Sequence, residues 1–112
     1  MDRKEAIRRY QETPRPAGIY RVTHTPSGRV LLGASPDAAA RLRRIRAQLE
    51  MSTHPSGELQ RDWDTDGESA FVFGVLDVLP PSQDPQANVN DDLETLLDLW
   101  TERLDIEPGA SY

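Results

Sequence analysis

The sequence contains no cysteine and only two histidines, His24 and His54. Without thiols the chain can form neither a disulfide bond nor a cysteine-ligated zinc site, and two histidines are too few for a histidine-rich metal centre. The absence of cysteine is typical of cytoplasmic proteins, so we expect a cytoplasmic location. Aromatic residues make up only 6% of the chain, and each is therefore expected to have a packing role.

Long apolar runs are also absent. No stretch approaches the roughly 18 apolar residues that could span a bilayer, and residues 1–13 are charged throughout, with no apolar core of a signal peptide. We therefore expect no membrane association. The length of 112 residues, 37% of them hydrophobic, is that of one domain with a single small core.

Lysine is nearly missing, since 12 of the 13 basic residues are arginine. Residues 1–61 carry a net charge of +6 and residues 62–112 a net charge of −12, which together give −6. This asymmetry predicts a basic face and an acidic face. The basic face could meet a polyanion, although the acidic half would oppose its approach. The acidic half itself could be a surface for a protein partner or only a solubilising surface.

The first 35 residues have the pattern of a helix followed by a hairpin. Residues 2–12 form a weak amphipathic helix, and the prolines at 14 and 16 end it. Residues 18–25 alternate as a strand, 26–28 (Pro-Ser-Gly) form a turn, and 29–33 form a second strand. This spacing predicts an antiparallel hairpin.

A helix is predicted next, with Ser35 as its N-cap, Pro36 at its first position and Asp37 near the positive end of its dipole. Its apolar residues recur at helical spacing on one face. They are Ala38, Leu42, Ile45 and Leu49. Four arginines lie off this face or at its border, at positions 41, 43, 44 and 46.

The second half alternates between the two periodicities. Residues 58–66 form a helix that Gly67 ends, residues 70–79 form a third strand, and Asn90 caps a last helix. The apolar stripe of that helix is Leu93, Leu96, Leu97, Trp100 and Leu104. This order predicts an α/β (α+β) domain, with a small three-stranded antiparallel sheet flanked by helices.

Two short motifs lie in the predicted hairpin. Gly-Ile-Tyr at 18–20 is followed, ten residues later, by Leu-Leu-Gly at 31–33. Together with Arg41 in the next helix, the segment 52–63 and the third strand, this order resembles the GIY-YIG nuclease superfamily. The resemblance covers residues 17–104 and is nearest to short bacterial single-domain members. Residues 1–16 are then an N-terminal helix and linker, and 105–112 a tail.

The resemblance implies an endonuclease that cuts nucleic-acid phosphodiesters with one divalent ion, Mg²⁺ or Mn²⁺. It assigns Tyr20 as the base or its relay, Arg41 as the phosphate clamp, and His54 as an aid to the nucleophile or the phosphate. The family's metal ligand, a glutamate on the last helix, aligns with Leu97. Glu94 shares a helix face with that position and is the better replacement, and Asp98 is adjacent in sequence.

Two further positions depart from the family pattern. Leu31 stands where the second motif has its tyrosine, and Ile45 stands one turn after the arginine, where the family has a histidine. Neither side chain can orient water or phosphate. The resemblance is therefore to a family member with a degenerate active site.

Three hypotheses follow. The first is a weak or inactive nuclease that still binds DNA weakly, with Arg43, Arg44 and Arg46 as additional nucleic-acid contacts. The second is a working endonuclease with Glu94 or Asp98 as metal ligand, and the third is a protein-interaction module that uses the acidic half. Each implied site residue also has a plainer interpretation as a packed aromatic, a surface ion pair or a loop residue.

The aspartates at 62, 64 and 66 alternate like the start of a calcium loop. The glycine and glutamate that such a loop requires do not follow, so we expect no metal there.

Overall fold

The computed structural model describes residues 16–80, 88–105 and 111–112. The helix expected at 2–12 lies outside the described residues. The described elements are β1 (Gly18–His24), β2 (Arg29–Ser35), α2 (Ala38–Glu50), α3 (Gly57–Asp66), β3 (Phe71–Val78) and α4 (Val89–Arg103). A 3-10 turn at Glu68–Ala70, which the sequence pattern did not predict, joins α3 to β3.

The three strands form one antiparallel sheet in the order β2-β1-β3, which confirms the predicted sheet and hairpin. Tyr20 pairs with Gly33 on one side and Val75 on the other. Ile19 pairs with Ala34 and Asp77, so β3 contributes one extra residue, Leu76, at this bulge. Because neighbouring side chains in a strand point to opposite faces, Tyr20 and Ile19 face different layers.

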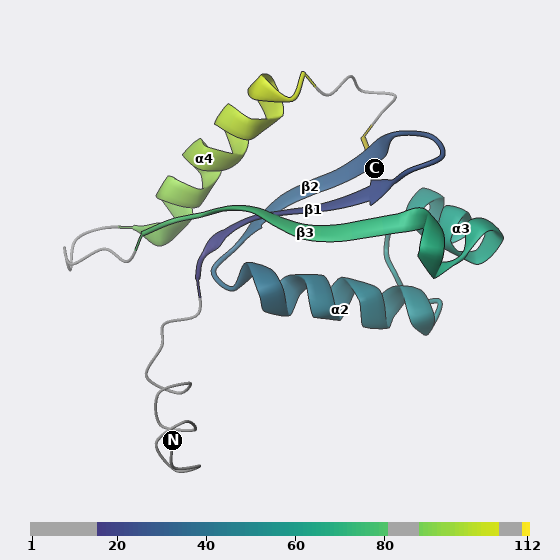
Figure 1. Ribbon diagram of the computed structural model, residues 1–112. Helices are drawn as coiled ribbons and strands as arrows, with labels where there is room; N and C mark the ends of the chain where they lie inside the picture. Colours follow the sequence, from purple (N-terminus) through teal and green to yellow (C-terminus); the bar gives the residue numbers. More distant parts are fainter. Residues whose placement is uncertain (1–15, 81–87, 106–110) are drawn as a thin grey trace, which may run out of the picture.

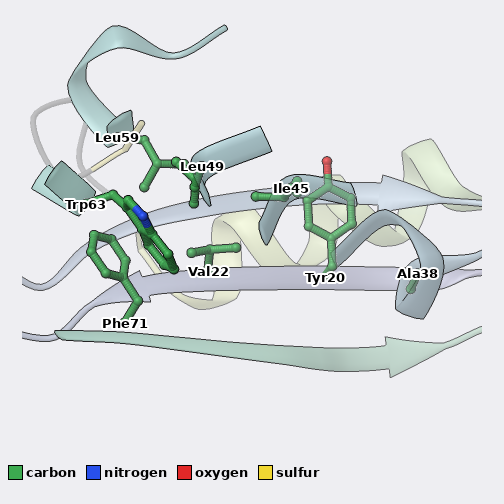
Figure 2. Close-up of a cluster of buried hydrophobic side chains, with 8 residues drawn as sticks. All are labelled: Tyr20, Val22, Ala38, Ile45, Leu49, Leu59, Trp63 and Phe71. Carbon is green, nitrogen blue, oxygen red and sulfur yellow. The ribbon is translucent and has the colours of Figure 1, made fainter. Parts of the chain in front are cut away.

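The main core lies between the sheet and the helices α2 and α3 (Figure 2). From the sheet it receives Tyr20, Val22 and Phe71, and from the helices Ala38, Ile45, Leu49, Leu59 and Trp63. The predicted apolar face of α2 is confirmed, with Leu42 partly buried at its border. Burial of this face fixes α2 against β1 and sets the direction of every side chain along the helix.

The opposite face of the sheet is covered by α4 (Figure 1). Ile19 is fully buried there, and Leu93 of α4 is 3% exposed. The indole Nε1 of Trp100 donates a hydrogen bond to Asp77 Oδ2 at 2.9 Å, and Asp77 stands opposite Ile19 in the sheet. The sheet therefore separates α4 from α2 and α3.

The starts of two helices differ from the prediction. Asp37, and not Ser35, caps α2, because its carboxylate accepts a hydrogen bond from Ala40 N. Ser35 still belongs to β2, where it pairs with Gly18, so Pro36 precedes the helix. Likewise α4 is capped by Asn88 and not by Asn90. The prediction that Gly67 ends α3 is confirmed, with a φ of +81°.

None of the helices within the described residues combines the length and the apolar character needed to cross a bilayer.

Candidate functional site

Tyr20 stands between β1 and α2, next to Ile45 and Ala38 (Figure 2). Its ring lies across the neighbouring strand at Gly33. A Cβ atom at Gly33 would lie 2.9 Å from Cε2 of Tyr20 and closer still to Cζ and the hydroxyl. Because Gly33, in the second motif, has no side chain, it leaves room for the ring of Tyr20 from the first motif.

Arg41 lies on α2, one turn before Ile45, and is exposed. Among the described residues its guanidinium forms no hydrogen bond or ion pair, unlike that of Arg46 on the same helix. Its positive charge acts on His54, in the loop between α2 and α3. Burial lowers the pKa of His54 below its usual 6.5, and the charge of Arg41 lowers it further.

Three of the hydrogen bonds in the loop between α2 and α3 fix the position of His54. The backbone N–H of His54 donates to Gln60 Oε1 at 3.2 Å, and Nδ1 of the ring accepts from the backbone N–H of Ser56 at 3.0 Å. Gln60 Nε2 in turn donates to the carbonyl of Leu49 at the end of α2, at 3.0 Å. The loop is thus fastened to both helices, and the direction of the imidazole is set by backbone groups.

The three residues that the resemblance implied are placed as follows. Arg41 and His54 lie within electrostatic range of each other, and Tyr20 packs under α2 beside the turn that carries Arg41. None of the three forms a hydrogen bond to another. The three residues offer a cation on α2, a phenol beneath α2 and an imidazole in the loop that follows α2.

The two positions that depart from the family pattern are parts of the core. Ile45 is 2% exposed and packs beside Tyr20, and Leu31 is partly buried against the same cluster. Where the family has polar groups around the tyrosine, this chain has apolar contacts.

The residues that could replace the metal ligand lie on α4. Leu97 is half-buried, whereas Glu94 and Asp98 are exposed. Both carboxylates lie on the helix that covers the sheet face opposite Tyr20. Within the described residues no three His, Cys, Asp or Glu side chains lie together in a way that could hold a metal ion. Leu97 itself offers no oxygen to a divalent cation.

The basic residues of α2 divide into two sets. Arg43 and Arg44 are exposed and have no ion-pair partner among the described residues. Arg46 pairs with Glu68 at 2.7 Å, and its guanidinium lies 4.8 Å from the centre of the Phe73 ring. The sequence pattern groups Arg46 with the DNA contacts, but its side chain links α2 to β3 and to the turn before β3.

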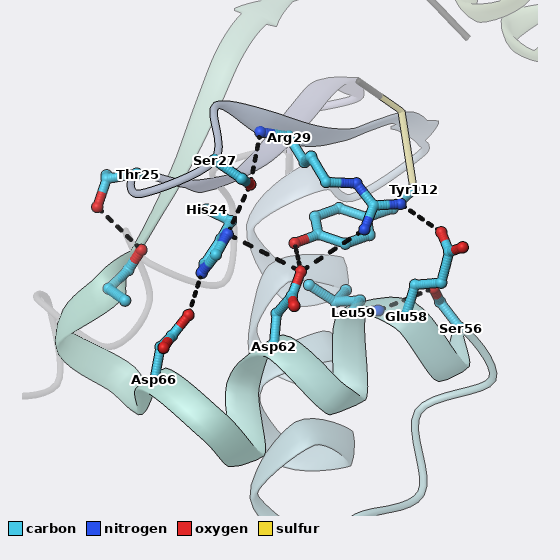
Figure 3. A network of polar contacts seen from close by, with 11 residues as sticks. His24, Thr25, Ser27, Arg29, Ser56, Glu58, Leu59, Asp62, Asp66 and Tyr112 are labelled. Carbon is cyan, nitrogen blue, oxygen red and sulfur yellow. Dashed lines mark hydrogen bonds and ion pairs between the residues drawn. The ribbon is translucent and has the colours of Figure 1, made fainter. Parts of the chain in front are cut away.

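Sequence reasoning missed a polar cluster at the other end of the hairpin (Figure 3). Its centre is His24, which is only 4% exposed. The ring binds Ser27 Oγ through Nδ1 and Asp66 Oδ2 through Nε2, both at 2.6 Å. We name it the His24 network, and its members are His24, Ser27, Arg29, Glu58, Asp62, Asp66 and Tyr112.

The rest of the His24 network surrounds Arg29. Its guanidinium pairs with Glu58 and with Asp62, the latter at 3.7 Å, and lies 4.4 Å from the centre of the Tyr112 ring. The Tyr112 hydroxyl donates to Asp62, and burial and this bond raise the pKa of Tyr112. Two of the aspartates that resembled a calcium loop thus bind side chains of the hairpin and the tail. Their spacing of four residues on one helix face was the available signal.

The sheet order, its register and the helices on its two faces define a nuclease-like domain with the GIY-YIG fold. No protein-family model matches the sequence, and no curated protein does. Two solved structures match the fold of this chain. The chain is similar to a point mutant of the catalytic domain of the intron endonuclease I-TevI, with a TM-score of 0.67 and 25% identity over 87% of this chain and 91% of that one. A second structure of the catalytic domain of the homing endonuclease I-TevI gives a TM-score of 0.66 and 24% identity, over 86% and 95%.

Proposed function

We propose that this domain binds nucleic acid through the surface around Tyr20, Arg41 and His54, and that it cleaves phosphodiesters weakly or not at all. The observation that carries the proposal is the state of Arg41. It is exposed, has no carboxylate partner among the described residues, and lies within electrostatic range of His54. A guanidinium left without a protein anion is available to a phosphate.

The likeness to an endonuclease catalytic domain supports nucleic acid as the ligand class. Arg41 would hold a phosphate through two parallel N–H bonds. Arg43 and Arg44, exposed on the same helix, would meet neighbouring phosphates of the strand. Tyr20 presents its ring beside this surface but is 7% exposed, so its hydroxyl is the least accessible of the three groups.

The proposal of weak or absent cleavage rests on the lack of an oxygen ligand at the position where the family binds its metal ion. Mg²⁺ or Mn²⁺ would supply charge neutralisation at the phosphate in an active nuclease. Leu97 offers no oxygen to such an ion, and Glu94 and Asp98 project from the helix behind the sheet. We therefore expect this chain to lack a metal-dependent cleavage step.

Binding is tested by the fluorescence anisotropy of a labelled DNA duplex at low salt. We expect dissociation constants in the range of nonspecific contacts, roughly 10⁻⁶ to 10⁻⁴ M. Arg41→Ala and Arg44→Glu should each weaken binding several-fold. Arg103→Glu changes the net charge as Arg44→Glu does, but lies on α4 behind the sheet, and should weaken it much less. Equal curves for wild type and Arg44→Glu would favour a protein-interaction module instead.

Cleavage is tested by the nicking of a supercoiled plasmid with Mg²⁺ or Mn²⁺. We expect at most traces of nicked product. Robust nicking that disappears in Arg41→Ala would overturn the proposal of an inactive domain. If Glu94→Ala or Asp98→Ala also abolished it, a working endonuclease with its metal ligand on α4 would be the correct description.

A further inference from the structure

We infer that His54 meets a bound phosphate as a neutral hydrogen-bond donor through Nε2, and not as a base that takes a proton from water. The phosphate in this inference rests on the proposed function. The state of the imidazole itself follows from the loop geometry and can be measured without any ligand.

Nδ1 of His54 is held as a hydrogen-bond acceptor. The backbone N–H of Ser56 points at this nitrogen from 3.0 Å and can only donate, so Nδ1 must offer its lone pair and carry no proton. A neutral imidazole has one N–H, which must then be at Nε2. No described residue bonds to Nε2, so this N–H is the group that the ring offers to a ligand.

The orientation of the ring is fixed by the loop. The loop bond from His54 N to Gln60 Oε1 and the bond from Gln60 Nε2 to Leu49 O tie the residue to the end of α2. Gln60 is therefore a positioning residue, because it holds the backbone of His54 while Ser56 holds the ring. Two independent contacts keep the same nitrogen facing away from the loop.

The surroundings of His54 also disfavour its protonated form. Burial and the charge of Arg41 both lower the pKa of His54, which keeps the neutral ring dominant at pH 7. A second proton would have to enter at Nδ1, opposite the Ser56 N–H, and would break that bond. An N–H donor beside a guanidinium is suited to phosphate oxygens, whereas a general base would need a free lone pair at Nε2.

The tautomer can be read directly by long-range ¹H–¹⁵N correlation spectra of histidine-labelled protein. The chain has only two histidines, and a His24→Gln variant assigns the signals. At neutral pH we expect His54 to show an unprotonated Nδ1 and a protonated Nε2. A protonated Nδ1 with a bare Nε2 would overturn the inference.

A pair of variants at Ser56 tests the cause. Ser56→Ala removes the hydroxyl that caps Leu59 N but keeps the backbone N–H, and the tautomer should remain unchanged. Ser56→Pro removes the N–H as well, at a φ of −80° that proline adopts. We expect this variant to show a mixture of tautomers, and an unchanged spectrum would contradict the role of the Ser56 N–H. Circular dichroism checks that both variants are folded. If one of them is not, the ¹H–¹⁵N spectrum of the wild-type protein still decides the tautomer.

The phosphate contact is tested by a second matched pair in the anisotropy assay. His54→Gln places an amide N–H near the position of Nε2, and its affinity for the DNA duplex should stay within about twofold of wild type. His54→Asn places its amide near Nδ1, and should lose about tenfold, the order expected for a charge-assisted hydrogen bond. Equal losses in both variants would overturn the donor role. No DNA binding by wild type would overturn the proposed function, while the tautomer would still be decided by the spectra.

Discussion

Gly33 shows how closely the two motifs of the hairpin depend on each other. Adding one methyl group there would place a carbon atom against the Tyr20 ring, so Gly33→Ala must displace the ring or the strand. We expect a loss of about 1–3 kcal/mol in the free energy of unfolding, as for other overpacked cores. Gly74→Ala is the matched control, because a Cβ there meets no atom within 4 Å. Its effect on urea denaturation should be within about 1 kcal/mol, and equal losses in the two variants would contradict the close approach.

The residues of the candidate site could be identified only in part from the sequence. Arg41 and His54 were selected from the order of motifs, and the structure places them within electrostatic range. His54 bonds to the backbone N–H of Ser56 and to the side chain of Gln60. Both contacts depend on the conformation of the loop between α2 and α3. No periodicity encodes that conformation.

At the level of elements, the His24 network joins the hairpin to α3. Asp66→Ala would leave Nε2 of a nearly buried His24 without a partner, and we expect a loss of about 1–3 kcal/mol in the free energy of unfolding. Asp64→Ala removes the same charge from the same end of α3. Asp64 is exposed and bonds only to Gln60, so its loss should stay near 0.5 kcal/mol. Chemical denaturation compares the two, and similar midpoints would show that the buried pair contributes little.

The elements themselves were largely predictable, whereas their first residues were not. The apolar face of α2 follows from the spacing of Ala38, Ile45 and Leu49, which needs no tertiary information. The start of α2 depends on the pairing of Ser35 with Gly18, a contact across the sheet. That pairing keeps Ser35 in β2 and moves the cap to Asp37.

At the level of the whole molecule, the distribution of charge determines how the domain would respond to salt. Three arginines of α2 have no described partner, so at most about three phosphates should be neutralised there. The slope of log affinity against log salt should then be about −3 or shallower on duplex DNA. Arg43→Ala should make that slope shallower by about one unit. Anisotropy titrations over a salt series measure it, and an unchanged slope would remove Arg43 from the interface.

The sequence indicates a basic and an acidic half, but it does not indicate which arginines are free of ion pairs within the protein and so able to bind a ligand. Arg29 and Arg46 belong to the basic half, yet both are engaged by acidic residues of α3 or the turn after it. Two of these pairings, Arg29 with Asp62 and Arg46 with Glu68, cross from one half of the chain to the other. They could be recognised only after the fold brought those segments together.

The His24 network also has a consequence for the order in which the contacts of the domain form during synthesis. His24 meets Asp66, 42 residues later, and Asp62 meets Tyr112, 50 residues later. On a ribosome, the hairpin can pair as soon as residue 35 has emerged, since its contacts are local. Arg29 and Asp62 then lack the Tyr112 ring and hydroxyl until the last of these residues leaves the exit tunnel. The nascent domain thus passes through a stage in which the sheet is formed but Arg29 and Asp62 do not yet contact Tyr112.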